Sequence, residues 1–171
     1  MRIGFGGIGK GYAAEMAKRV MQNIGINDGV VNASGDLTAW GHQADGKPWT
    51  IGVANPNFKH HIIGRFEINN GSVATSGDYE KFVVIGGKKY SHTINPKTGM
   101  PAEGMKSVTI IAPFAELCDT LTTPVIIMGV EAGLHFINQI HGVEAILIDS
   151  TDKIYYSKNI KISKNENLKI E

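Results

Sequence analysis

The sequence predicts an α+β domain in which mixed, mainly antiparallel sheets pack with helices. Two observations predict this class. Short strand-like runs are separated by Gly, Asn and Asp turn signals, which favours hairpins. Helical stretches are grouped between these runs and do not alternate with them as in βαβ folds. No linker divides the 171 residues, so we expect one domain over 1–162 and a polar, frayed tail over 163–171.

The first half of the chain begins with an expected helix and continues as strands. Ala13, Met16, Ala17 and Val20 recur at helical spacing, which predicts a helix over 12–22 that stops near Gly25. Turn residues at 45–46, 69–71 and 86–87 then separate apolar runs. The strands expected from these runs are 30–32, 49–53, 62–68, 72–75, 82–85 and 88–92.

The second half is expected to carry the remaining helices. A strand over 107–112 leads into a helix over 114–128, and a second helix follows over 131–140. Strands at 143–148 and 154–160 complete the pattern.

Composition excludes several classes of function. Seventeen basic residues nearly balance sixteen acidic ones, so no strong field attracts nucleic acid or an anionic membrane. Cys118 is the only cysteine, so it forms no intramolecular disulfide. The sequence shows no apolar run of membrane-spanning length and no signal-peptide pattern. Binding is therefore expected at a local site.

A glycine-rich segment leads into the first expected helix. Residues 4–9 match G-x-G-x-x-G, the dinucleotide-binding fingerprint, but no buried strand precedes them and hairpins follow. The remaining alternatives are a packing turn and a phosphate site, in which backbone N–H groups, the helix N-terminus and Lys10 face an anion.

Four further groups of polar residues interrupt the apolar pattern. Residues 32–36 (Asn-Ala-Ser-Gly-Asp) suit a bulge or a ligand contact, and residues 75–79 (Thr-Ser-Gly-Asp-Tyr) suit a turn or a ligand contact. His92 lies beside an Asn-Pro-x-x-Gly turn and could act as acid or base. Asp119 and Thr123 are four residues apart, which puts two hard oxygen ligands for Mg²⁺ on one helix face.

In this order the clusters resemble the ApbE family of FAD:protein FMN transferases. The resemblance covers roughly residues 5 to 150. It is carried by Gly-Gly-Ile-Gly-Lys-Gly-Tyr-Ala at 6–13, by the segments 32–36 and 75–79, by Ser-His-x-x-Asn-Pro-x-Thr-Gly at 91–99, and by Asp119 with Thr123. It implies an ApbE-like, T-fold-related domain. Members of the family carry about a hundred or more residues ahead of the glycine-rich segment, so we expect the domain to be N-terminally incomplete.

The resemblance also implies roles for single residues. Mg²⁺ would be held by Asp119, Thr123 and the carbonyl of Gly9, with FAD as substrate. His92 would lie near the reacting phosphoryl group, and Asp119 would serve catalysis through the metal. The candidates for flavin or phosphate contact are Lys10, Gly9, Asn32, Asp36, Thr75 and Ser76.

The implied reaction transfers FMN to a Ser or Thr of an acceptor protein, a subunit of a respiratory redox complex, and releases AMP. Two alternatives stay open: a Mg²⁺-dependent FAD pyrophosphatase and a non-catalytic flavin-binding module. Family resemblance points to the periplasmic side of the cell envelope, although a cytoplasmic location also stays open. An uncovered sheet edge predicts self-association. Pro124 disfavours helix at Thr123, so the sequence leaves the geometry of the metal site undecided.

Overall fold

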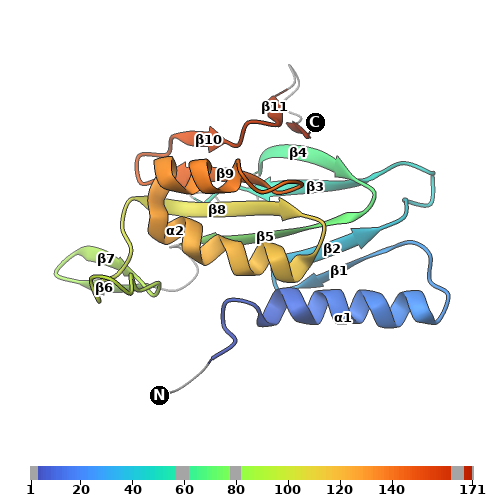
Figure 1. Ribbon diagram of the computed structural model, residues 1–171, viewed down its shortest axis with the longest axis horizontal. Helices are drawn as coiled ribbons and strands as arrows, with labels where there is room; N and C mark the ends of the chain where they lie inside the picture. The colour runs from blue at the N-terminus through green and yellow to red at the C-terminus, as the bar shows by residue number, and fades with distance from the viewer. Residues whose placement is uncertain (1–3, 57–61, 78–81, 163–167, 171) are drawn as a thin grey trace.

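A six-stranded antiparallel sheet forms the centre of the protein (Figure 1). The computed structural model describes residues 4–56, 62–77, 82–162 and 168–170. The strand order is β1-β2-β5-β8-β9-β10. The bounds of these strands are β1 Gly29–Ala33, β2 Asp36–Trp40, β5 Gly71–Gly77, β8 Met105–Ala112, β9 Glu144–Asp149 and β10 Ile154–Tyr156.

Three two-stranded sheets surround the central one. They are β3 (Trp49–Ala54) with β4 (Ile62–Ile68), β6 (Phe82–Ile85) with β7 (Lys88–Ser91), and β11 (Ile160–Ile162) with β12 (Leu168–Ile170). The β6–β7 hairpin projects from the body at the left of Figure 1. All of these pairings are antiparallel, so the expected α+β class is confirmed, and its sheets are antiparallel throughout the described pairs.

Two helices complete the fold, α1 (Gly9–Asn23) and α2 (Ala115–Ile137). α2 crosses one face of the sheet, and α1 lies beside α2 and the first strands (Figure 1). By length and composition alone α2 could cross a membrane. In this fold it is the core helix, because Cys118, Val125 and Ile137 are fully buried.

The core occupies both faces of the central sheet because neighbouring residues of a strand point to opposite sides. Val108 and Ile110 of β8 pack toward α2, in one apolar cluster with Val125. Ile111 belongs to a second cluster, which includes Phe66 of the β3–β4 hairpin. The molecule is therefore layered as helix, sheet and hairpin, and α2 is fixed against the sheet along its length.

The two helices predicted over 114–128 and 131–140 are joined across a kink and together make up α2. Within α2 only Gly129 has non-helical backbone angles, with φ 76° and ψ −175°. A positive φ of this size suits glycine and strains other residues. The predicted break therefore exists as a kink that separates two helices within α2, and the prediction of two helices is confirmed.

The predicted bulge at residues 32–36 is a tight hairpin turn. Ala33 pairs with Asp36, and the two central residues, Ser34 and Gly35, have φ of 57° and 102°. Positive φ at both positions is the type I′ pattern, which matches the twist of the flanking strands. The turn starts β2, a strand that the sequence pattern did not predict.

The end of the chain also differs from the expected pattern. The strand predicted over 154–160 divides into β10 and β11. The ladder of β9 and β10 ends at Ser157, because the backbone N–H of Ala145 donates to the Ser157 hydroxyl and not to a backbone carbonyl. Within the tail expected to be frayed, residues 168–170 form β12 and pair with β11. Residues 163–167 and 171 lie outside the described residues.

The buried face of α1 is not its apolar face. The helix buries Gly11, Ala14 and Glu15. Val20, one of the apolar positions that predicted the helix, is 61% exposed. Glu15 is buried because one of its carboxylate oxygens accepts the backbone N–H of Ala115, the first residue of α2, at 3.3 Å. A carboxylate here satisfies an unpaired donor at a helix N-terminus and complements the helix dipole.

Candidate active site

The start of α1 meets the first turns of α2, and a glycine makes this contact possible. The backbone N–H of Gly11 donates to Asp119 Oδ2 at 3.1 Å. A Cβ at Gly11 would lie 2.3 Å from the carbonyl oxygen of Ala115 and 2.9 Å from the Cβ of Asp119. Only glycine allows so close an approach. The glycine-rich segment and Asp119, far apart in sequence, therefore form one site.

Asp36 and Lys10 join this junction from β2 and α1. Lys10 Nζ lies 3.2 Å from Asp36 Oδ1, and Asp36 is 1% exposed. Among the described residues, Asp36 Oδ2 has no hydrogen-bond partner. Burial, followed by the neighbouring charge of Asp119, raises the pKa of Asp36 from 3.8 to about 6, although Lys10 acts in the opposite direction. Two buried carboxyl groups thus lie together, with one lysine to balance them.

Thr123 lies one helical turn after Asp119, as the spacing predicted. Pro124 leaves this turn helical, since the only non-helical angles within α2 are those of Gly129. Thr123 is half-buried, and a Cβ at Gly7 would lie 3.9 Å from its hydroxyl oxygen. Gly9, two residues after Gly7, is the first residue of α1. The structure thus brings Thr123 and the glycine-rich segment to the same junction.

Ser76 at the end of β5 holds the junction from the sheet side, whereas its neighbour Thr75 points to the other face of the sheet. Ser76 Oγ lies 2.9 Å from Thr122 Oγ1, and Thr122 donates its hydroxyl to the backbone carbonyl of Asp119 at 2.9 Å. Because that proton is committed, Ser76 is the donor to Thr122. Thr75 Oγ1 lies 2.9 Å from Thr109 Oγ1 on β8, so the structure does not bring Thr75 into the junction. Sequence reasoning missed Thr122, whose only signal is its position next to Thr123.

Asn32, which was predicted to contact the flavin or phosphate, has a structural role in the turn between β1 and β2. The side chain of Asn32 is exposed and accepts the backbone N–H of Gly35 at 2.8 Å. In this structure it stabilises the hairpin turn, as Asn side chains commonly do. Asp78 and Tyr79 lie outside the described residues.

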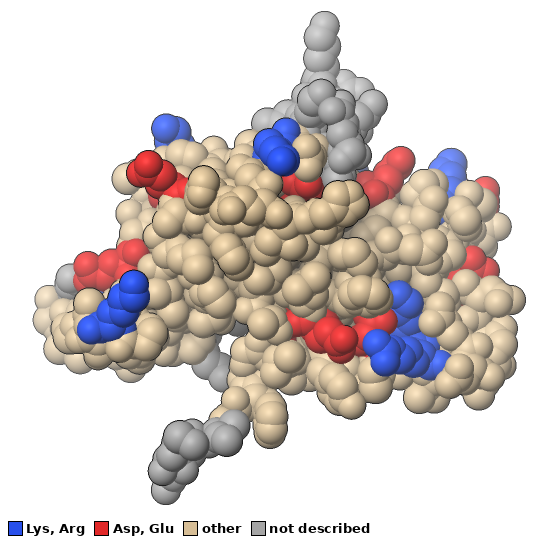
Figure 2. All heavy atoms as spheres, viewed as in Figure 1, with Lys and Arg blue, Asp and Glu red and all other residues tan. Residues whose placement is uncertain are grey.

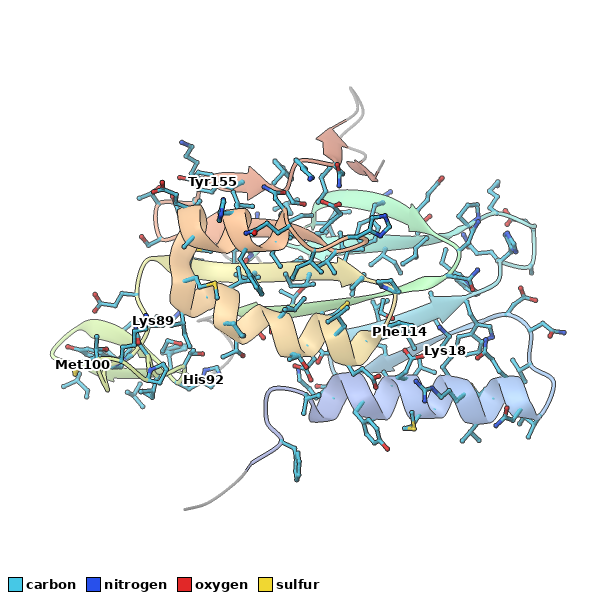
Figure 3. The ribbon with its side chains drawn as sticks, viewed as in Figure 1. Lys18, Lys89, His92, Met100, Phe114 and Tyr155 are labelled. Atoms are coloured by element: carbon cyan, nitrogen blue, oxygen red, sulfur yellow. The ribbon has the colours of Figure 1, made fainter. Side chains whose placement is uncertain are left out.

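His92 belongs to a second part of the candidate site. It is exposed, directly after β7, and Figure 3 shows it beside the β6–β7 hairpin, apart from the start of α1. The following turn is closed by Asn95, whose carbonyl accepts the N–H of Gly99 at 2.8 Å. A cavity of about 450 Å³ lies beside this turn, lined by Asn95 and Thr98 together with Ile127 of α2. The structure therefore does not bring His92 into the Asp119 junction.

Comparison with known proteins places this arrangement in a family. The sequence profile of the ApbE family matches residues 1–147. The chain belongs to the ApbE family. Among its relatives, the FAD:protein FMN transferase of Escherichia coli K12 is 36% identical over 126 residues, which cover 72% of this chain and 36% of that enzyme. The corresponding enzyme of Haemophilus influenzae is 28% identical over 155 residues, which cover 89% of this chain and 44% of that enzyme.

Solved structures of ApbE proteins share the fold. The ApbE protein of Thermotoga maritima superposes with a TM-score of 0.84 at 37% identity, covering 92% of this chain and 52% of that one. The flavinyl transferase ApbE of Pseudomonas stutzeri, in its apo form, gives 0.79 at 28% identity and covers 92% of this chain and 50% of that one. This chain thus spans about a third to a half of the length of these relatives.

The junction fits the magnesium ion that the ApbE resemblance implies. Asp119 is 4% exposed, and the partnerless oxygen of Asp36 lies in the same buried pair of carboxyl groups. Buried carboxylates without compensating charge are unfavourable, so the pair favours a cation. Its donors are carboxylate, hydroxyl and carbonyl oxygens, which suit Mg²⁺. The described residues contain no group of three or more His, Cys, Asp or Glu suited to a metal.

Proposed function

We propose that this chain carries the Mg²⁺-dependent catalytic part of an FAD:protein FMN transferase. It would cleave the pyrophosphate of FAD, attach FMN to a Ser or Thr hydroxyl of an acceptor protein, and release AMP. The observation that carries the proposal is the buried Asp119 carboxylate at the junction of the glycine-rich segment with α2. The relatives that are similar to this chain carry the name FAD:protein FMN transferase.

The residues of the junction suit a pyrophosphate substrate. Lys10 and the N-terminus of α1 present positive charge to a phosphate, because the first N–H groups of a helix have no partner within it. Asp119, Thr123 and the Gly9 carbonyl would hold Mg²⁺. When bound, the ion supplies charge neutralisation on the pyrophosphate. Ser76 and Thr122 fix the turn that carries Asp119, so its carboxylate is preorganised.

The transfer step exchanges the phosphoanhydride bond of FAD for a phosphoester bond to the acceptor. The acceptor hydroxyl oxygen forms a bond to the FMN phosphorus, the bond from that phosphorus to the AMP phosphate breaks, and AMP leaves. The hydroxyl proton goes to a base. We propose His92 for this role, because it is exposed directly after β7, whose Tyr90 lines the cavity, and a histidine side chain can act as a base. This assignment requires bound FAD to extend from the junction to the cavity.

The acceptor and the cellular address are part of the same proposal. A flavin carried on a Ser or Thr suits a subunit of a respiratory redox complex, and the site would then face the periplasmic side of the cell envelope. We also propose self-association through β1, which is an edge strand of the central sheet. A sedimentation-velocity series that shows only monomer at every concentration would contradict self-association.

Replacing Asp119 tests the proposed function. With Asp119→Ala we expect Mg²⁺-dependent FAD cleavage to be lost while the circular dichroism spectrum stays native, because the fold has a large apolar core elsewhere. Asp45→Ala is the matched control, since Asp45 pairs with Lys47 on the surface. Full activity of Asp119→Ala would exclude the metal assignment.

A further inference from the structure

Asp36 carries a buried carboxyl group that is not one of the expected metal ligands. Asp36 begins β2, is 1% exposed, and lies against Asp119 of α2. Its side chain is therefore enclosed between sheet and helices. A carboxylate in such a place is unfavourable unless it is paired and hydrogen-bonded.

Only one of the two carboxylate oxygens of Asp36 has a partner in the described part of the chain. Lys10 Nζ binds Oδ1 at 3.2 Å, which leaves Oδ2 without a partner among the described residues. The salt bridge holds the carboxylate in place next to the carboxyl group of Asp119. A structural ion pair would be expected to satisfy both oxygens.

The junction carries more negative than positive charge. Asp36 and Asp119 carry two negative charges against the single positive charge of Lys10. A divalent cation would reverse this excess and leave the site with one net positive charge. Such a site attracts an anionic substrate, whereas the cation-free junction repels it.

We propose that Asp36 is a second carboxylate ligand of the cation that Asp119 binds. Lys10 holds the Asp36 side chain through Oδ1, and Asp36 Oδ2 contributes to binding the ion. This inference rests on the proposed function, since it assumes that Asp119 binds a divalent cation. It assigns Asp36 to the metal, whereas the sequence pattern had suggested a flavin or phosphate contact. The hairpin turn at Ser34 and Gly35 then has a functional consequence, because it fixes the start of β2 at the junction.

The test is direct cation binding by the full chain without FAD. Mn²⁺ replaces Mg²⁺ as the probe, and free Mn²⁺ is followed by its electron paramagnetic resonance signal. We expect one Mn²⁺ site in the wild type, displaceable by Mg²⁺ and absent in Asp119→Asn. Asp36→Asn keeps the shape and the acceptor for Lys10 but removes the charge, so we expect its dissociation constant to rise at least tenfold. Asp45→Asn, the surface control, should bind as the wild type does.

The outcomes separate the two claims. Wild-type affinity in Asp36→Asn, together with loss of binding in Asp119→Asn, would overturn the role of Asp36 and leave the proposed function standing. A wild-type chain without an Asp119-dependent site would refute the cation assignment and this inference with it. Unfolding is excluded as a cause by the denaturation midpoint of Asp36→Asn, measured in EDTA.

Discussion

Replacing Asp36 with Asn should stabilise the cation-free protein at neutral pH. The structure raises the pKa of Asp36 from 3.8 to about 6, chiefly by burial. One pKa unit corresponds to about 1.4 kcal/mol, so ionised Asp36 disfavours the folded state by up to about 3 kcal/mol. Asn removes this charge but hydrogen-bonds Lys10 less strongly than a carboxylate does. We therefore expect the free energy of unfolding to rise by about 2 kcal/mol at pH 7.5.

The stabilisation by Asp36→Asn should depend on pH. Between about pH 4 and pH 6 the folded protein binds the Asp36 proton more tightly than the unfolded chain does, so wild-type stability falls as pH rises through this window. Below pH 4 both states are protonated, and the advantage of Asp36→Asn should disappear. Urea denaturation in EDTA at pH 7.5 and pH 4 measures both values. A variant that is less stable than wild type at pH 7.5, or equally stabilised at both pH values, would refute the reasoning.

Three further changes address the helix junction and the histidine. Gly11→Ala should destabilise the protein by about 2 kcal/mol, because the new Cβ would lie 2.3 Å from the backbone carbonyl oxygen of Ala115. Gly6→Ala is the control and should have little effect, because a Cβ at Gly6 would meet open space. Thermal denaturation of the two variants measures the difference. Glu15→Ala should destabilise by about 1 kcal/mol through the lost cap on the N–H of Ala115, and an unchanged melting temperature would contradict this. His92→Ala should lower kcat for FMN transfer more than it raises the Kd for FAD, and a pure binding defect would exclude its role as the base.

Local sequence patterns predicted most of the fold but not the orientation of α1. Helical spacing of Ala13, Met16, Ala17 and Val20 predicted a helix, yet the structure buries Gly11, Ala14 and Glu15. Glu15 faces inward because the first N–H of α2 requires an acceptor. That requirement comes from an element a hundred residues later, so no local periodicity could reveal it.

The site was predicted in parts, and its geometry came from tertiary structure. The i, i+4 spacing of Asp119 and Thr123 survives because the helix continues through Pro124. The pairing of Asp36 with Lys10 depends on a Ser-Gly hairpin turn, a weaker signal than Asn-Gly, and the pattern had suggested a bulge. His92 and Asp119 share a family signature but lie on separate parts of the molecule, and sequence spacing carries no information about that separation.

The distribution of charge over the surface agrees with a localised site. On the face that Figure 2 shows, acidic and basic side chains lie beside one another in small groups, with areas of other residues between these groups. The formal net charge of the chain is +1. A near-neutral chain of this kind has no strong overall field to attract an anionic substrate, so we expect binding to come from a local site, as the composition predicted.

The most direct test of the account is AMP release from FAD by the full chain with Mg²⁺, in the presence of a candidate acceptor subunit from a flavin-carrying respiratory complex. The account predicts AMP and covalently flavinylated acceptor in equal amounts, and loss of both when EDTA is added. AMP accompanied only by free FMN would indicate a pyrophosphatase. No AMP under any of these conditions would contradict the claim that this chain carries the catalysis.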